Sequence, residues 1–141
     1  LEEQVNRSVA AGARVILGGK RPYPDGAFFE PTILANVAEG MPAYEEELFG
    51  PVAAIIIVPD QGTAIRIAND SKYGLHAGVL GADLQRARRV ASRIRSGRVV
   101  INGMTDDPQA PWGGFKYSGV GREYGRYGIE AFLETRAILE S

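Results

Sequence analysis

The sequence contains no cysteine and only one histidine, His76. Without cysteine the chain can form no disulfide framework, no thiolate metal site and no cysteine nucleophile. A lone histidine cannot build a zinc site unless several carboxylates converge on it, and His76 is expected to be an ordinary strand residue. The residue inventory therefore predicts no metal site and no thiol-dependent catalysis by this chain alone.

The sequence also lacks an excess of charge of either sign and any long hydrophobic run. Sixteen basic side chains are matched by seventeen acidic ones, so no overall field draws the chain toward nucleic acid or anionic lipid. No apolar stretch approaches the ~20 residues needed to cross a bilayer. The start, Leu1-Glu2-Glu3, has neither the basic nor the apolar region of a signal peptide. We expect a cytoplasmic protein with no nucleic-acid and no membrane partner.

The residues that are present predict an α/β fold in a single domain, residues 1–141. The run from Ala53 to Val58 is continuously apolar and β-branched, as in a strand covered on both faces of a parallel sheet. After it, a unit of aspartate, helix, glycine and strand occurs twice, beginning at Asp60 and Asp83. This repeat predicts βαβ crossovers whose helices cover the sheet. We therefore expect a three-layer α-β-α unit with a mainly parallel sheet and a central strand that includes Ile55 to Val58.

Residue chemistry alone defines no complete active site. The glycines from Gly119 to Gly125 resemble a dinucleotide fingerprint, but a Pro/Gly loop precedes them instead of a strand, which favours a tight turn. The arginines between Asp83 and Ser96 spread around the polar side of a helix, which favours a solvated or interface-facing surface. Consecutive glutamates such as Glu45-Glu46-Glu47 point in different directions and rarely converge on one ion. No catalytic residue is assigned on these grounds.

Two longer motifs are more specific. They are Glu46-Glu47-Leu48-Phe49-Gly50-Pro51-Val52 and the run from Pro111 to Gly125, PWGGFKYSGVGREYG. Together they resemble the aldehyde dehydrogenase superfamily, and the segments Asn69–Leu75 and Gly97–Asn102 between them are similar to that family as well. Their order and spacing resemble the last third of such an enzyme. The resemblance implies the C-terminal portion of the catalytic domain followed by an oligomerisation tail.

The resemblance also implies a reaction: oxidation of an aldehyde to a carboxylic acid with NAD or NADP, through a cysteine thiolate. The family keeps that cysteine upstream of the matched region, so the isolated chain is expected to be inactive. Glu47 matches the glutamate that accepts hydrogen bonds from the nicotinamide-ribose hydroxyls, and Phe49 matches the aromatic residue near the nicotinamide. The loop from Gly103 to Trp112 matches the mouth of the substrate tunnel. Its candidate specificity residues are Met104, Asp106, Asp107 and Trp112.

The tail from Phe132 to Leu139 matches a strand that family members donate to a sheet between subunits, which implies a homo-oligomer. A second interpretation stays open: a non-catalytic α/β assembly module or a pseudoenzyme. The length of the parent reading frame would distinguish the two, because only an enzyme needs an upstream cysteine and dinucleotide domain. Which aldehyde is oxidised, and whether NAD or NADP is used, the sequence does not determine.

Overall fold

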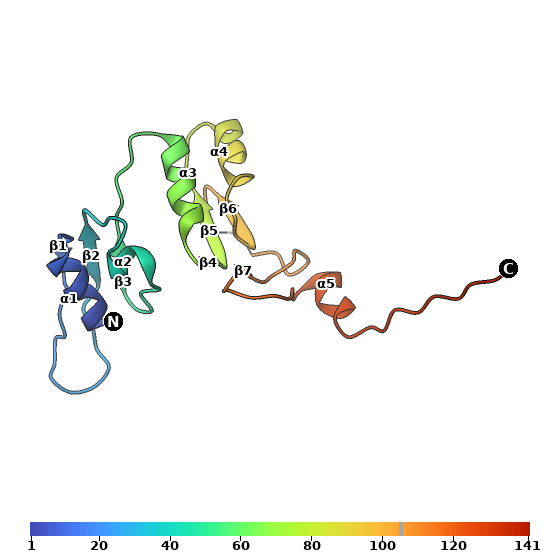
Figure 1. Ribbon diagram of the computed structural model, residues 1–141, viewed down its shortest axis with the longest axis horizontal. Coiled ribbons are helices and arrows are strands. Elements are labelled where there is room, and N and C mark those ends of the chain that lie inside the picture. The colour runs from blue at the N-terminus through green and yellow to red at the C-terminus, as the bar shows by residue number, and fades with distance from the viewer. Residues whose placement is uncertain (105) are drawn as a thin grey trace. The chain divides into compact units, whose positions relative to one another are not determined.

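The computed structural model describes residues 1–104 and 106–141, and the chain divides into two compact units, Leu1–Thr63 and Ala64–Ser141 (Figure 1). Helices and parallel strand pairs occur in one chain, which confirms the mixed α/β class. Two compact units can belong to one domain, so the single-domain prediction stays a prediction. Within the described residues no helix is long and apolar enough to cross a membrane.

The first unit is a three-stranded sheet with two helices. In chain order its elements are α1 (Glu2–Ala10), β1 (Arg14–Leu17), β2 (Thr32–Ala35), α2 (Pro42–Glu45) and β3 (Val52–Ala54). The central strand is β2, which pairs with β1 antiparallel and with β3 parallel. Glu2 and Glu3 lie in the first turn of α1, where carboxylates favour the helix dipole, and Gly12 takes the positive φ of 114° that turns the chain toward β1.

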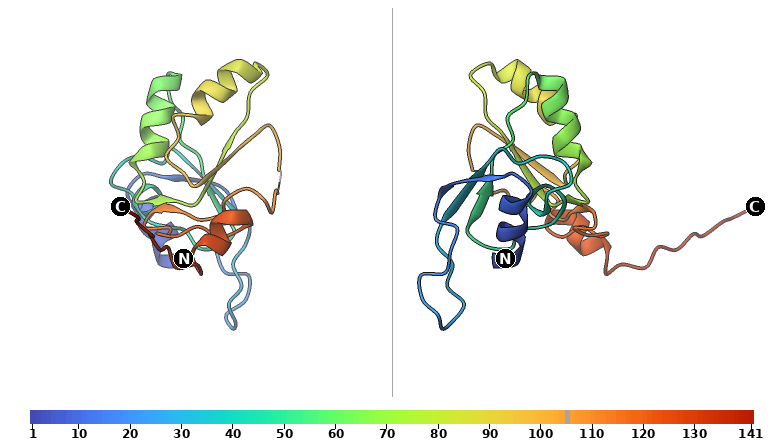
Figure 2. Two further views of the ribbon diagram at one scale, coloured as in Figure 1. Left: turned by 90° about the vertical axis from the view of Figure 1, so that its right-hand side faces the viewer. Right: turned by 60° about the vertical axis from the view of Figure 1, so that its left-hand side comes forward.

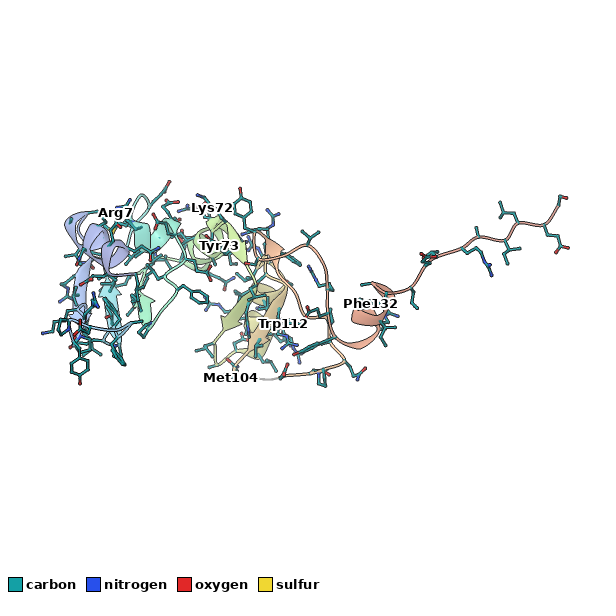
Figure 3. All side chains as sticks on the ribbon, turned by 90° about the horizontal axis from the view of Figure 1, so that it is seen from below. Arg7, Lys72, Tyr73, Met104, Trp112 and Phe132 are labelled. Atoms are coloured by element: carbon teal, nitrogen blue, oxygen red, sulfur yellow. The ribbon has the colours of Figure 1, made fainter. Side chains whose placement is uncertain are left out.

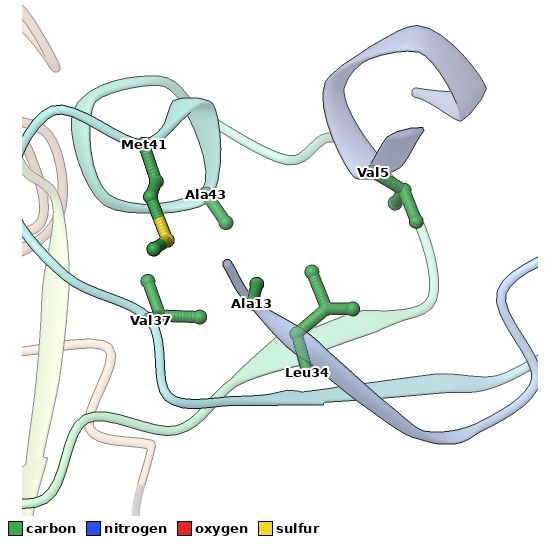
Figure 4. Close-up of a cluster of buried hydrophobic side chains, with 6 residues drawn as sticks. All are labelled: Val5, Ala13, Leu34, Val37, Met41 and Ala43. Carbon is green, nitrogen blue, oxygen red and sulfur yellow. The ribbon is translucent and has the colours of Figure 1, made fainter. Parts of the chain in front are cut away.

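The core of this unit joins α1, β2 and α2. Leu34 on β2 is fully buried, and its neighbours come from α1, from α2 and from the segments beside them (Figure 4). Ser8 of α1 is also fully buried: its Oγ donates to the carbonyl of Gln4 at 2.8 Å and accepts from the N–H of Ala43 at 2.9 Å. The buried cluster consists of Val5, Ala13, Leu34, Val37, Met41 and Ala43.

The predicted central strand through Ile55 to Val58 is wrong. The strand ends at Ala54, and β3 is an edge of its sheet. The last link to β2 is the N–H of Ile55, which donates to the carbonyl of Leu34 at 2.8 Å. Beyond that point Ile57 is 84% exposed. A β-branched run supplies strand propensity, but a strand also needs a partner ladder, and in this chain β2 offers one only to the first few residues.

The second unit contains one of the two crossovers that the repeat predicts; the one beginning at Asp60 is not formed, because within the described residues β3 pairs only with β2. The strands β5 (His76–Val79) and β6 (Arg98–Ile101) are parallel, with His76 opposite Arg98, and α4 (Leu84–Ala91) connects them and packs on both. The Asp83 carboxylate caps α4 by accepting from the N–H of Arg86 at 3.0 Å. The other elements are α3 (Gln61–Asp70), which crosses the boundary between the units, β4 (Tyr73–Gly74), β7 (Phe115–Lys116), which pairs with β4 antiparallel, and α5 (Gly125–Glu130).

The chain after α5 extends away from the helix without regular secondary structure (Figure 2). Residues 132–141 are all exposed and form no regular secondary structure in the single chain. The strand that the resemblance implies from Phe132 to Leu139 would pair with another subunit. A strand needs a neighbour to satisfy its N–H and C=O groups, and among residues 1–104 and 106–141 the tail pairs with no other strand. Its role in subunit assembly stays a prediction.

Candidate functional site

The first candidate site is the segment Glu46–Pro51, which leads from α2 into β3. Met41 precedes Pro42 at the first turn of α2, a position that suits proline because no helical N–H is needed there. The bond from Ala43 to Ser8 attaches this short helix to α1. Leu48, within the segment, packs against the buried cluster of the unit. The segment is therefore anchored at its start and at its middle.

The two glutamates of the segment differ in their partners. The Glu46 carboxylate accepts from Gln4 Nε2 at 2.9 Å and lies 3.6 Å from the guanidinium of Arg7. Gln4 Nε2 also donates to the backbone carbonyl of Glu47 at 3.1 Å. The Glu47 carboxylate is exposed and has no hydrogen-bond or ion-pair partner among residues 1–104 and 106–141. Gln4 thus fixes the backbone of Glu47 and leaves both carboxylate oxygens free to accept.

Phe49 is 88% exposed, although the residue before it is packed on the core. The next residue, Gly50, donates from its N–H to the carbonyl of Leu48 at 2.8 Å, and a Cβ placed there would collide with the side chain of Leu1. A side chain at position 50 would therefore require the Leu1 side chain to move. Two free carboxylate oxygens can accept from a pair of adjacent hydroxyls, and an uncovered aromatic ring can pack on a planar ring.

The second candidate site is a pocket of about 330 Å³ in the second unit. His76 and Arg98 enter it from neighbouring positions of β5 and β6, and Trp112 lies beside these strands (Figure 3). Tyr124, the residue before α5, closes another side and takes a positive φ of 69°. The lining residues are His76, Arg98, Met104, Asp106, Trp112 and Tyr124.

Arg98 connects the strand to the loop that follows it. Its guanidinium donates to Asp106 Oδ1 at 2.7 Å and to the backbone carbonyl of Asp107 at 3.4 Å. Its Cζ lies 4.6 Å from the centre of the Trp112 ring, within the range of a cation–π contact. One side chain therefore contacts three residues of the loop.

Trp112 is held by aromatic and backbone contacts. Its ring stacks on Tyr124 with centroids 6.4 Å apart, and the His76 ring approaches edge-on at 6.2 Å. Its backbone forms an isolated bridge with Glu123: each N–H donates to the other residue's carbonyl, at 2.9 and 2.6 Å. The pocket wall is therefore a fixed aromatic surface with one ion pair.

The glycine-rich segment that follows Trp112, Gly113 to Gly125, allows close packing of backbone against backbone. A Cβ at Gly113 would lie 2.5 Å from the carbonyl oxygen of Gly121, so this close approach of two backbones needs glycine. Lys116 Nζ donates to the carbonyls of Asn69 and Ser71, at 2.8 and 2.7 Å, at the C-terminal end of α3. Cations stabilise helix C-termini through the helix dipole. These contacts tie the motif to α3 within the second unit.

Three of the four predicted substrate residues line one pocket: Met104, Asp106 and Trp112. Asp107 lines a neighbouring cavity of about 310 Å³, and its carboxylate accepts from the N–H of Gln109 at 2.9 Å. Position 105 of the predicted loop lies outside the described residues.

Sequence reasoning missed three residues of the pocket, His76, Arg98 and Tyr124. The parallel pairing of the two predicted strands carried a signal for His76 and Arg98, because such strands place residues side by side. No sequence signal pointed to Tyr124. Within residues 1–104 and 106–141, no group of three or more metal-binding side chains is placed to hold an ion.

A family model described as the aldehyde dehydrogenase family matches residues 1–138. The chain belongs to the aldehyde dehydrogenase family. This confirms the resemblance carried by the two motifs.

Curated aldehyde dehydrogenases match nearly the whole chain. A 3-succinoylsemialdehyde-pyridine dehydrogenase of a Pseudomonas species is 46% identical over 99% of this chain and 30% of its own length. The succinate semialdehyde dehydrogenase [NAD(P)+] Sad of Escherichia coli K12 is 42% identical over 98% of this chain and 30% of its own. The chain thus spans about 30% of the length of these relatives.

Solved structures of the family share the fold. Aldehyde dehydrogenase C of Pseudomonas syringae, a cysteine-to-alanine mutant in complex with NAD+ and octanal, superposes with a TM-score of 0.91 at 44% identity. That match covers 97% of this chain and 29% of the other. An aldehyde dehydrogenase of Mycobacterium tuberculosis in complex with NAD+ gives a TM-score of 0.87 at 42% identity, over 93% of this chain and 28% of the other.

Proposed function

We propose that the chain serves as the C-terminal part of an NAD(P)-dependent aldehyde dehydrogenase that oxidises an aldehyde to a carboxylic acid. The family membership and the similarity to structures in complex with NAD+ and with octanal support this proposal. In this role the first unit contributes contacts to the cofactor, and the loop of the second unit contributes contacts to the substrate. This chain covers only about 30% of the relatives' length, so in this proposal the functional enzyme is longer than the chain.

The observation that carries the proposal is the free Glu47 carboxylate on a fixed backbone. Gln4 and the packed Leu48 hold the segment, so presenting the carboxylate requires no further ordering of the chain. A carboxylate can accept from two adjacent hydroxyls at once, and such charged hydrogen bonds contribute about 1.5–3 kcal/mol each. Glu47 would hold the nicotinamide ribose, while the exposed ring of Phe49 would pack near the nicotinamide. When bound, the nicotinamide supplies the hydride acceptor for the oxidation.

The chain itself supplies no thiolate nucleophile for an aldehyde, because it contains no cysteine. A thiolate suits this chemistry because it attacks a carbonyl well and also leaves well. We therefore propose that the nucleophile comes from another part of the enzyme and that the isolated chain gives no aldehyde-dependent NAD(P)H.

The test is the substitution Glu47→Gln in the longer dehydrogenase that carries this segment. Losing the charge of one acceptor should lower kcat/KM for NAD(P) about tenfold or more, because about 1.4 kcal/mol corresponds to a factor of ten. Glu46→Gln is the matched control: the neighbouring glutamate already bonds to Gln4, and its change should alter kcat/KM less than threefold. Equal effects of the two substitutions would contradict the ribose role of Glu47.

The assembly-module alternative is supported by the tail, where Phe132, Leu133, Ile138 and Leu139 are all exposed large hydrophobic residues. Such a row of uncovered apolar side chains on an unpaired segment favours pairing with another chain, and we propose a homo-oligomer on that basis. Sedimentation of the chain with and without residues 132–141 tests it. A mass that stays monomeric at high concentration in both forms would contradict the assembly role and leave the cofactor role untouched.

A further inference from the structure

The pocket of the second unit contains a cation that is shielded from solvent and an anion that is not. The Arg98 side chain is 13% exposed, whereas the side chain of its partner Asp106 is 72% exposed. The other lining residues are aromatic or apolar apart from His76: Met104, Trp112 and Tyr124. The electrostatic character of the pocket therefore depends on one exposed carboxylate.

A partly buried guanidinium without a partner attracts anions strongly, because little water screens its charge. With Asp106 bonded at 2.7 Å, the pair carries no net charge. The face of the guanidinium is at the same time covered by Trp112. The pocket wall is thus closer to a neutral aromatic surface than to an anion site.

We infer that Asp106 is a specificity-determining residue: by neutralising Arg98 it makes this pocket favour aldehydes with an uncharged aromatic or aliphatic substituent over aldehydes that carry a carboxylate. A carboxylate substituent would meet the Asp106 charge and would have to displace it from Arg98. Removing the Asp106 charge frees Arg98 to bind such a substituent. This inference deepens the proposed substrate role of the loop and rests on it.

Binding in the 141-residue chain tests the inference without any dehydrogenase activity. Trp112 is the sole tryptophan, so its indole N–H gives a single resonance that reports on the pocket. Two probes of matched shape are 4-methylbenzyl alcohol and 4-(hydroxymethyl)benzoate, which differ in a methyl and a carboxylate group. In the unchanged chain the alcohol should shift the resonance at lower concentration than the benzoate derivative.

Asp106→Asn should raise the affinity for the benzoate probe relative to the alcohol about fivefold or more. Asp107→Asn is the matched control, since it removes the same charge from the same loop while the Arg98 contact, made through the Asp107 backbone carbonyl, remains. An equal change of the probe ratio in both variants would overturn the inference, because it would reflect net charge alone. Failure of both probes to shift the resonance would overturn it as well.

A kinetic arm separates this inference from the proposed function. In the longer dehydrogenase, Asp106→Asn should raise the ratio of kcat/KM for 4-carboxybenzaldehyde to that for 4-methylbenzaldehyde about fivefold or more. Oxidation of both aldehydes with an unchanged ratio would refute the selectivity role while leaving the dehydrogenase function intact. Oxidation of neither by the unaltered enzyme, together with the expected probe ratios in the chain, would instead contradict the proposed function.

Discussion

Ser8→Ala tests how the segment Glu46–Pro51 is held, because the hydroxyl of Ser8 is the acceptor for the first turn of α2. Ser8 is fully buried and accepts from the N–H of Ala43 at 2.9 Å. Removing the acceptor leaves a buried N–H without a partner, at a cost of about 1–3 kcal/mol. Alanine stabilises α1 by about 0.5 kcal/mol relative to serine, because its helix propensity is higher. The net expectation is a loss of about 0.5–2.5 kcal/mol in the free energy of unfolding of the first unit.

Amide hydrogen exchange measures this effect at the residue where it arises. The exchange of the Ala43 N–H should accelerate about tenfold, since each 1.4 kcal/mol corresponds to a factor of ten. Ser92→Ala is the control: the Ser92 hydroxyl also donates to a helix carbonyl, that of Arg89 at 3.0 Å, but it is exposed and, within the described part of the chain, accepts from no buried N–H. Its substitution should change stability by less than about 0.5 kcal/mol. Unchanged exchange at Ala43, or equal losses in the two variants, would refute the reasoning.

Two further predictions concern the second unit. Gly97→Ala should strongly destabilise this unit, because the new Cβ would overlap the backbone carbonyl of Gly113, whereas Gly78→Ala, which meets nothing within 4 Å, should change its thermal midpoint little. The bond from the Arg86 N–H lowers the pKa of the Asp83 carboxyl. A lowered folded-state pKa means that the cap of α4 is fully present above the unfolded pKa of about 4 and is lost as the pH falls through the folded value. The helical circular dichroism signal should therefore decrease below about pH 4, and Asp83→Asn should weaken that pH dependence. The same pH dependence in the variant and in the unchanged chain would contradict the capping role of Asp83.

The sequence by itself determined the features that depend on local chemistry. The absence of cysteine excludes a thiol nucleophile in this chain. Asp83 was predicted to cap the helix that follows it, because a carboxylate before an apolar periodic run caps a helix, and it is the N-cap of α4. The parallel pair β5 and β6 followed from that same unit. The two motifs were enough to indicate the family. Met104, Asp106 and Trp112 were expected in one loop, and they line one pocket.

Only the tertiary structure decided which side chains have partners. Glu46 and Glu47 are identical in the sequence, yet Gln4 binds the carboxylate of the first and the backbone of the second. The run after Ala54 has strong strand propensity, but its strand stops where β2 offers no further ladder. Arg98 became part of the pocket because the loop folds back onto its strand. Propensity and capping depend on neighbours in the chain, whereas burial, pairing and charge neutralisation depend on groups that only folding brings together.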